Sequence, residues 1–535
     1  MMKRRSFIKK TTFTSIPLLL KGIPVVASSD LLSQSLEKMA LAALNCDRIL
    51  VIIQQNGGND GLNTVFPMDK WSNLVNARAN ILMDQKQVLP LSENPTTGLH
   101  PAMTEMKNLY DNGKMMIVQG VSYPNPIYSH FKATDIWFTG SGSAKDLDTG
   151  WIGRALDIKY PNFPNGYPTA EMPDPLAIQI GSTLPFSLQG PHINMGYSAP
   201  DPNALLNVIN GVADPAPDSD YGNELTFLRL MKDQSNEYIK VIQKAYNVPL
   251  ATPVNYPTNN KLADQLKIVA KLINGGLKSP IYIVNHPYSH DTHSAQVNAT
   301  DKTQGAQATN LTLLSQAIGA FQQDLETMGK SDSVSGMTFS EFGRRIKSNA
   351  SQGTDHGAAA PVLFFGSMLN TSSQVKKSIY PVTGMIGKSP NLPINATVSD
   401  QVEMQFDYRQ LYTTLMQDWL CMTEAEANQV LGGNFVKLPV FSSTLLSSVD
   451  FDNDSIILFP NPSEDGTITL RFPDIVKDYV SVSLLSMNGQ LIQSEVFKMN
   501  EKELKLDYSR HVQEGLYILS IDWNGNRFYK KVLFN

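Results

Sequence analysis

The sequence is poor in cysteine. Only Cys46 and Cys421 occur among its 535 residues. Two cysteines exclude a disulfide framework, although a single bridge is compatible with an oxidising compartment. They also argue against thiolate metal sites, so histidine and carboxylate side chains remain as the candidate ligands.

Charged residues are sparse as well. They make up 17% of the chain, and the net charge is −5 with a pI near 5.9. This acidic balance lacks the excess of basic residues that nucleic-acid binding requires, so we expect no nucleic-acid partner. No segment has the apolar length of a transmembrane helix, so none is expected. The 42% of hydrophobic residues are enough for a proper core, and the length suggests roughly two to four domains.

The N-terminus resembles an export signal. The pair Arg4-Arg5 is followed by Phe7 and by a weakly apolar stretch from about 11 to 27. An ordinary basic start to a cytosolic protein would lack this stretch and the small residues that end it. The pattern resembles a twin-arginine signal peptide over residues 1–29, which implies the twin-arginine translocase as a partner and export of a folded protein.

The C-terminal part has a different pattern from the rest. After about residue 440, short alternating strands and turn signals replace helical periodicity, which predicts a linker over 441–454 and a small β-sandwich over 455–535. The string FPNPSEDG…SLLSMNGQLI…EGLYILSI…YKKVLFN resembles the type A sorting domain of the type IX secretion system of Bacteroidota. The resemblance implies the type IX machinery as a partner and a location at the cell surface or outside the cell.

The body begins with a buried strand that ends in a polar loop. Residues 48–55 form a continuous apolar run typical of a strand buried on both faces, and Asn56-Gly57-Gly58-Asn59-Asp60 follows it. In open α/β sheets ligands bind at the carboxyl ends of strands, where Asp60 would lie. Asp60 is therefore either a metal ligand or the cap of a helix.

A second strand over 115–121 runs through prolines into a helix that is expected to begin at His130. Ser129 then falls at the N-cap, which explains a serine there. The same position also suits a nucleophile, because helix N-terminal amides stabilise an attacking alkoxide and an anionic substrate group. His130 is a candidate base, ligand or helix-start residue.

A third strand over 280–284 leads into the densest histidine cluster of the chain. His286, His290, Asp291 and His293 lie within eight residues, although the whole chain has only eight histidines. Such clustering at a strand end favours a metal site over a plain polar loop. Asp291 and His293, two positions apart in an extended loop, are expected to face one side together.

A fourth element supplies further ligands. Residues 336–345 suggest a short strand that turns into a loop and carries Glu341. Asp355 and His356 follow between glycines that let the backbone bend around an ion. Asp-His-Gly is a weak motif by itself, but it gains weight beside the histidine cluster.

The body also resembles a known family over about residues 47–440. The motifs, in order, are LVIIQQNGGNDGLNTVFP, YSHFKATDIWFTG, GWIGRAL, HDTHSAQ, SEFGRRIKSNASQGTDHG and DYRQLYTTLMQDWL. They are similar to the domain of unknown function 1501 family of the alkaline phosphatase superfamily. This implies an α/β fold with a central, mostly parallel sheet flanked by helices, and metals at the carboxyl edge of the sheet.

The resemblance also implies roles for individual residues. Asp60 stands where the superfamily has its first-strand metal aspartate, and Ser129 lies in the neighbourhood of the nucleophile. Asp291 and His293 correspond loosely to metal ligands, and Glu341 is a feature of the family. The implied metal ligands are Asp60, Asp291, His293, Asp355, His356 and Glu341. No Cys-x-Pro-x-Arg sequence occurs, which argues against an ordinary formylglycine sulfatase.

These observations predict an exported metal-dependent hydrolase of phosphate or sulfate esters. Ser129 or a bound water would attack, His130 would act as a base, and Arg344 or Arg154 would clamp the anion. The cofactor would be one or two divalent ions, with Zn, Mn, Mg and Ca all compatible with these ligands. Two alternatives remain: a catalytically silent, metal-stabilised protein that binds a glycan or a partner, and a structural component of the cell surface.

Overall fold

The computed structural model separates into two units, Met1–Cys46 with Ser443–Asn535, and Asp47–Ser442. The predicted signal peptide lies outside the described residues except for two short paired strands, β1 (Leu18–Leu20) and β2 (Ile23–Val25). Most of the predicted linker, residues 443–454, also lies outside them. The structure describes residues 18–20, 23–25, 46–205, 215–252, 254–371, 384–442, 456–477, 479–486, 491–510, 512–523 and 526–535.

A nine-stranded sheet forms the centre of the larger unit. Its order is β15-β7-β14-β11-β3-β10-β8-β9, and β16 pairs with β7. Only β14 runs antiparallel to its neighbours, which confirms the predicted α/β class with a mostly parallel sheet. The strands are β3 (Ile49–Gln54), β7 (Met115–Ser122), β8 (Ala177–Gln179), β9 (Tyr197–Ser198), β10 (Ile281–Asn285), β11 (Val334–Phe339), β14 (Ala360–Gly366), β15 (Met385–Ile386) and β16 (Phe406–Asp407).

Strand β3 is apolar throughout because both of its faces are covered. All six of its residues are buried. Ile49, Val51 and Ile53 pack into the main hydrophobic cluster, and the intervening residues face the opposite side of the sheet. The covering helices thus leave only the strand ends open to solvent.

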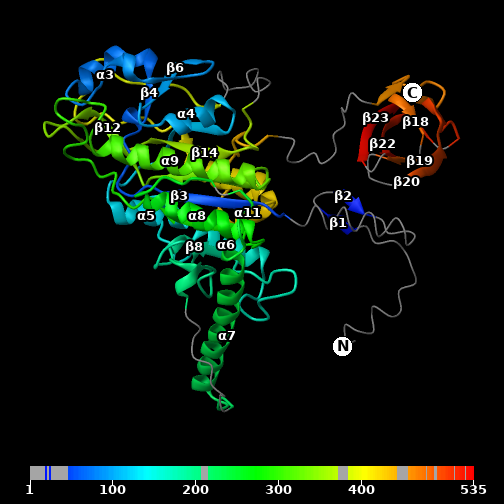
Figure 1. Ribbon diagram of the computed structural model, residues 1–535, viewed down its shortest axis with the longest axis horizontal. Coiled ribbons are helices and arrows are strands. Elements are labelled where there is room, and N and C mark those ends of the chain that lie inside the picture. Colours follow the sequence, from blue (N-terminus) through cyan, green and yellow to red (C-terminus); the bar gives the residue numbers. More distant parts are fainter. Residues whose placement is uncertain are drawn as a thin grey trace. The chain divides into compact units, whose positions relative to one another are not determined.

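Helices cover both faces of this sheet (Figure 1). Helices α4, α8 and α9 share the main hydrophobic cluster with β3 on one face. On the other face Trp137 of α5 stacks on Phe339 of β11, with 5.3 Å between ring centroids, and on Tyr408 of α10 at 4.5 Å. The helices are α3 (Trp71–Arg78), α4 (Thr104–Asp111), α5 (His130–Thr139), α6 (Trp151–Lys159), α7 (Asp220–Tyr246), α8 (Lys261–Asn274), α9 (Ala306–Thr327), α10 (Tyr408–Thr414) and α11 (Glu424–Leu431).

Two smaller sheets lie in the same unit. One has three strands, β4 (Val65–Pro67), β6 (Asn94–Leu99) and β5 (Leu89–Leu91). The other is a hairpin of β12 (Gly343–Ser348) and β13 (Thr354–Gly357). The sequence predicted only a loop after residues 336–345; the structure instead continues from β11 into this hairpin.

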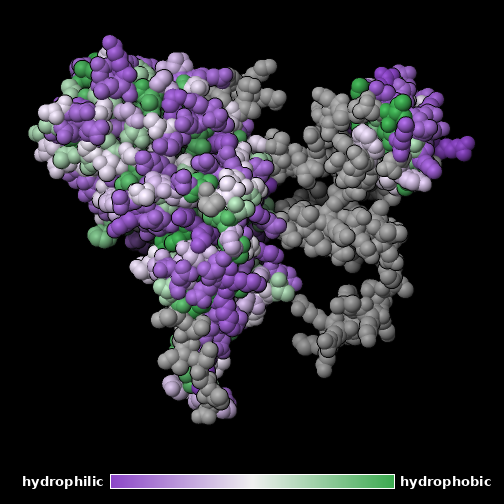
Figure 2. Space-filling view, viewed as in Figure 1, coloured by the Kyte–Doolittle hydropathy of each residue, from purple (hydrophilic) through white to green (hydrophobic). Residues whose placement is uncertain are grey.

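Both cysteines are disulfide-bonded. Among the described residues, no helix has the length and apolarity required to cross a membrane. Hydrophilic side chains predominate on the face of the larger unit seen in Figure 2, with hydrophobic ones scattered between them.

The C-terminal module is all-β, as predicted. It contains one three-stranded and one four-stranded antiparallel sheet, and their inward side chains, such as Leu470 and Leu519, share one hydrophobic core. The strands are β17 (Ile457–Phe459), β18 (Thr467–Val476), β19 (Tyr479–Ser486), β20 (Leu491–Lys498), β21 (Glu501–Asp507), β22 (Gly515–Trp523) and β23 (Asn526–Phe534).

Candidate metal centre

Four chain segments meet at the carboxyl edge of the central sheet. His130 opens α5, Asp291 follows β10, Glu341 follows β11, and His356 lies on β13. Parallel strands end at the same edge of a sheet, so their following loops lie together. One ligand atom each from His130, Asp291 and His356 lies within 4.8 Å of the other two. We call these three residues, together with His293 and Asp355, the histidine–carboxylate cluster.

Asp291 contacts each of the three histidines of this cluster and Arg344. Its Oδ1 lies 3.2 Å from His356 Nε2, 3.1 Å from His293 Nε2 and 2.6 Å from Arg344 Nη2. Its Oδ2 lies 3.5 Å from His130 Nε2. Partial burial raises the pKa of this carboxyl, but the hydrogen bond and the positive charge of Arg344 act in the opposite direction, and the net result is a pKa lowered to about 2. Asp291 is therefore a carboxylate at any physiological pH.

Glu341 orients His130. Its Oε1 lies 2.8 Å from His130 Nδ1 and also accepts a hydrogen bond of 2.8 Å from the Gly57 backbone nitrogen. A carboxylate only accepts, so the proton of a neutral His130 ring lies on Nδ1, and Nε2 presents its lone pair toward Asp291. Glu341 was predicted as a metal ligand; the structure places it behind His130, where it is 2% exposed.

A backbone carbonyl orients His356 in the same way. Its Nδ1 lies 2.8 Å from the Tyr128 carbonyl oxygen, which can only accept, so Nδ1 carries the proton. Burial lowers the pKa of His356, which favours the neutral ring. Its Nε2 lone pair then faces Asp291. Hydrogen bonds of this kind on the far nitrogen are what fix the orientation of metal-binding histidines.

The contacts of His293 fit a cation in the cluster. Its Nε2 lies 2.9 Å from His356 Nε2, and its Nδ1 lies 3.2 Å from Asp355 Oδ1. His356 Nε2 offers a lone pair and Asp355 a carboxylate oxygen, so His293 would need protons on both nitrogens to satisfy them. If only one nitrogen carries a proton, the other lone pair of His293 meets a second acceptor, either His356 Nε2 at 2.9 Å or Asp355 Oδ1 at 3.2 Å. A divalent ion among these nitrogens and Asp291 would relieve that repulsion, and imidazole with carboxylate is a common donor set for such ions.

Asp355 supports the cluster from the hairpin. Burial raises the pKa of Asp355, but hydrogen bonds from Asn349 and His293 lower it overall. Asn349 Nδ2 donates to Asp355 Oδ1 over 3.2 Å and to the His293 carbonyl over 2.9 Å. Asn349 thus ties Asp355 and His293 to each other.

Asp60 does not join the cluster. Its Oδ2 lies 2.8 Å from Arg78 Nη1 and accepts a hydrogen bond of 2.6 Å from Gln296 Nε2, while its Oδ1 accepts from the Leu62 backbone nitrogen over 3.2 Å. The side chains of Asp60 and Arg78 are both fully buried. Of the two roles weighed for Asp60, the structure supports the cap, because its carboxylate closes the short 3-10 turn that follows.

Neither candidate anion clamp is free to bind an ester. Arg344 is buried. Its guanidinium donates to the carbonyl oxygens of Gly57, Gly58 (2.7 Å), Thr354 (2.8 Å) and His290 (3.1 Å), and also to Asp291 Oδ1. Its guanidinium therefore joins the loops after β3 and β10 to the hairpin.

Arg154 is likewise used within the fold. It donates to the carbonyl oxygens of Thr139, Thr149 and Val430 at 2.7, 2.6 and 2.8 Å, and burial lowers its pKa to about 10. Both arginines stabilise loops, so the predicted clamping role finds no support in their contacts.

Ser129 occupies the predicted N-cap of α5, but its hydroxyl makes no capping hydrogen bond. The side chain is exposed to solvent. Its chain neighbours on both sides contact the cluster, Tyr128 through its carbonyl and His130 through its ring. Ser129 therefore lies beside the cluster with an accessible hydroxyl.

A cavity of about 450 Å³ opens on one side of the cluster. Three of the described residues that line it, His130, Asp291 and Glu341, belong to the arrangement above. The others are Asn56, Gly57, Phe131, Thr134, Asp135 and Ser289. Most of these residues have no recognisable signature in the sequence, because an isolated Asn, Ser or Thr in a loop or helix start is too common to point to a site.

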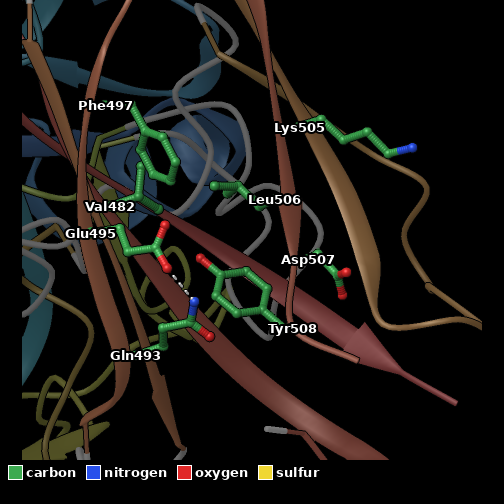
Figure 3. A pocket seen from close by; sticks show the side chains of 8 residues that line it. All are labelled: Val482, Gln493, Glu495, Phe497, Lys505, Leu506, Asp507 and Tyr508. Atoms are coloured by element: carbon green, nitrogen blue, oxygen red, sulfur yellow. Dashed lines mark hydrogen bonds between the residues drawn. The ribbon is translucent and has the colours of Figure 1, made fainter. Parts of the chain in front are cut away.

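A second cavity, of about 270 Å³, lies within the C-terminal module (Figure 3). Gln493 and Glu495 of β20 line it and share a hydrogen bond of 2.6 Å. Tyr508, the residue directly after β21, also lines it. Lys505 points away from the other labelled side chains. Its described lining contains no histidine.

Comparison with family models supports both resemblances. Residues 269–431 match the family described as a protein of unknown function, DUF1501, and residues 457–535 match the secretion system C-terminal sorting domain. The resemblances predicted from the sequence are thereby confirmed over these residues. None of the curated proteins matches the chain.

Several solved structures are distantly similar. A Bacteroides thetaiotaomicron protein connected with the metabolism of glycosaminoglycans is 10% identical, with a TM-score of 0.34 and coverage of 84% of this chain and 90% of that one. An alkaline phosphatase superfamily protein from Vibrio parahaemolyticus is 11% identical, with a TM-score of 0.31 and coverage of 86% and 79%. PorZ, a surface component of the type IX secretion system of Porphyromonas gingivalis, is 15% identical with a TM-score of 0.14; the match covers 18% of this chain and only 13% of PorZ.

Proposed function

Since this chain carries DUF1501-family residues in its body and a secretion-system sorting domain at its C-terminus, we propose that it is an exported, metal-dependent hydrolase of phosphate or sulfate esters. The sorting domain implies export to the cell surface or secretion. The observation that supports hydrolysis is the convergence of His130, Asp291 and His356, which come from three distant segments. Two imidazole nitrogens and a carboxylate beside an open cavity are a suitable cation site.

The residues that would hold the cation are His130 and His356 through Nε2 and Asp291 through its carboxylate, with His293 as a fourth candidate. A divalent ion bound there would polarise an ester oxygen and offset the charge that develops on it. The described lining of the cavity includes three carboxyl groups and neither lysine nor arginine, so an anionic ester needs such a cation to bind.

The chain's own groups have separate tasks in this proposal. Glu341 keeps the His130 ring in place through Nδ1, and Tyr128 does the same for His356. Arg344 holds Asp291 and keeps it ionised. The exposed hydroxyl of Ser129, or a water molecule beside it, is the candidate nucleophile, and the N-terminal amides of α5 lie where they stabilise negative charge.

The test combines metal analysis with turnover. We expect the purified chain to contain a divalent metal and to release anion from aryl phosphate or aryl sulfate esters, with activity lost on chelation. Asp291→Asn should lose both metal and activity, whereas Ser129→Ala should keep the metal. Loss of turnover in Ser129→Ala would assign the nucleophile to the serine, and retained turnover would assign it to water. Asp301→Asn, a change of an exposed aspartate in the same loop region, is the matched control.

A second candidate is a catalytically silent, metal-stabilised binding protein. The contacts of Arg344 and Arg154 favour it, because neither guanidinium is available to clamp a transferring anion. Retained metal together with no turnover of any phosphate or sulfate ester would support this candidate and contradict the hydrolase.

We also propose the twin-arginine route for the first export step, on the basis of Arg4 and Arg5. Replacing both by lysine should leave the unprocessed chain in the cytoplasm, as fractionation and immunoblotting would show. Unchanged export of this variant would contradict the proposal.

A further inference from the structure

An exposed aromatic ring stands at the cavity beside the cluster. Phe131 lines the cavity and is 86% exposed, more than any other large hydrophobic residue among those described. Most phenylalanine side chains are buried on folding, because an exposed ring loses the stabilisation that burial of its apolar surface provides. Phe131 lies in the first turn of α5, directly after His130, so the backbone that carries it is held in place by a helix.

Hydrogen-bonding side chains lie on both sides of this ring. Thr134 and Asp135 follow Phe131 by three and four residues and therefore lie on its face of α5. Asn56 and Ser289 come from the loops after β3 and β10. Asn56, Ser289 and Asp135 are exposed and Thr134 is half-buried, so all four can exchange water for a ligand. The cavity therefore offers one flat apolar surface and several polar groups around it.

We infer that this cavity is a subsite for a six-membered, polyhydroxylated ring that carries the ester group, with Phe131 as its stacking platform. The inference rests on the proposed function, because it places the ester at the cluster. A pyranose has an apolar face of C–H groups and a rim of hydroxyls, which matches the phenyl ring and its polar neighbours. An aryl ring would also stack on Phe131, but it offers no hydroxyl to hydrogen-bond with the amide, the two hydroxyls and the Asp135 carboxylate.

The size and position of the cavity agree with this assignment. About 450 Å³ lies within the usual range for small-ligand sites and accommodates a single hexose with space for water. Because His130 and Asp291 form part of its wall, a ring lying on Phe131 has its substituents next to the cluster. Phe131 is thus a specificity-determining residue, whose effect depends on what is attached to the ester.

The experiment compares three sulfate esters, glucose 6-sulfate, phenyl sulfate and ethyl sulfate, and the three corresponding phosphates. Binding to the purified full chain is measured by isothermal titration calorimetry, and turnover is measured by release of inorganic anion. For whichever anion, sulfate or phosphate, the chain binds more tightly, we expect the glucose ester to bind about tenfold more tightly than the ethyl ester. Phe131→Ala and Phe131→Leu should abolish this preference, Phe131→Trp should keep it, and Val436→Ala, which changes an exposed apolar residue elsewhere, should have no effect.

The outcomes separate the ring subsite from the hydrolase. A preference for the phenyl ester over the glucose ester, or a Phe131→Ala variant that changes glucose and ethyl esters equally or not at all, would overturn the subsite. Phe131-dependent binding of the glucose ester without release of anion from any ester would support the subsite and contradict the hydrolase. Release of anion at the same rate from esters with and without the sugar ring would support the hydrolase and overturn the subsite.

Discussion

Two aspartates follow neighbouring parallel strands, and each pairs with a buried arginine, yet their surroundings differ completely. Asp60, after β3, pairs with Arg78 and is fully buried. Asp291, after β10, pairs with Arg344 and is 35% exposed. Gln296 and a backbone amide complete the hydrogen bonds of Asp60. The carboxylate of Asp291 faces three histidines instead.

The comparison shows that a position at a strand end does not by itself make a metal ligand. A carboxylate surrounded by a guanidinium and amide donors has no lone pair left for an ion, and moving it would leave a buried charge unpaired. A carboxylate that shares its exposed side with imidazole nitrogens keeps that capacity. The first arrangement holds the loop after β3 in place, and the second leaves carboxylate oxygens exposed beside imidazole nitrogens.

The largest effect is expected at the buried pair. Asp60→Asn leaves the Arg78 guanidinium buried without its counter-charge and should lower the free energy of unfolding by about 3–5 kcal/mol. Thermal and urea denaturation would measure this, with Asp69→Asn at an exposed site as control. The metal content of the folded fraction should not change. A variant of normal stability that has lost its metal would identify Asp60 as a ligand, like Asp291.

Asp291→Asn should have the opposite profile. We expect metal affinity to fall more than 100-fold, since a ligand contributes more than the supporting groups whose removal costs 10–100-fold. Stability should change much less than in Asp60→Asn, because Arg344 keeps its contacts with four carbonyl oxygens. Competition with a chromogenic chelator gives the affinity. Unaltered affinity in this variant would remove Asp291 from the centre.

His100 reports on the buried surroundings of Asp60 through its pKa. It lies beside the Asp60 loop, donates from its backbone nitrogen to the Thr64 carbonyl, and accepts a hydrogen bond at Nδ1 from the Ala102 nitrogen. Burial lowers its pKa from 6.5 to about 4. The unfolded chain therefore takes up a proton below pH 6.5 and the folded chain does not, so the free energy of unfolding should fall by roughly 2–3 kcal/mol between pH 6.5 and 4.

His100→Asn keeps an acceptor for Ala102 and should flatten this part of the pH profile, as denaturation at a series of pH values would show. The exposed His192 provides the control, because His192→Asn should keep the full slope. An unchanged slope in His100→Asn would mean that other groups cause the acid sensitivity.

The smallest effect is expected at Glu341. Glu341→Gln keeps an oxygen that accepts from Gly57 and His130 but removes the negative charge behind the ring, so metal affinity should fall on the order of tenfold. Glu341→Leu, which removes the acceptor as well, should bind still more weakly, and Glu403→Gln at an exposed site should bind normally. An affinity in Glu341→Gln as low as in Asp291→Asn would identify Glu341 as a direct ligand.

Much of the fold is predictable because the strands of the sheet are apolar on both faces. The run from Ile49 to Gln54 and that from Ile281 to Asn285 are typical of strands that are buried on both faces of a sheet. The β12–β13 hairpin was missed because its first strand, GRRIKS, is mainly polar. Pairing with β13 defines that strand, and pairing leaves no hydrophobic pattern in the sequence.

The site was predictable where its residues are close in sequence. Asp291 and His293, and likewise Asp355 and His356, attract notice as pairs, and the structure brings the two pairs together. Asp60 looked equivalent because it also follows a buried apolar strand; its partner Gln296 lies 236 residues away. Contacts of this kind follow from tertiary packing and have no local signature.

We propose that a divalent cation binds between His130, Asp291 and His356. Elemental analysis of the purified wild-type chain beside a folded Asp291→Asn/His356→Ala double variant tests it most directly. We expect a stoichiometric amount of one divalent metal in the wild type and only traces in the variant. A wild type without metal after dialysis at neutral pH, or a variant that keeps the full amount, would contradict it.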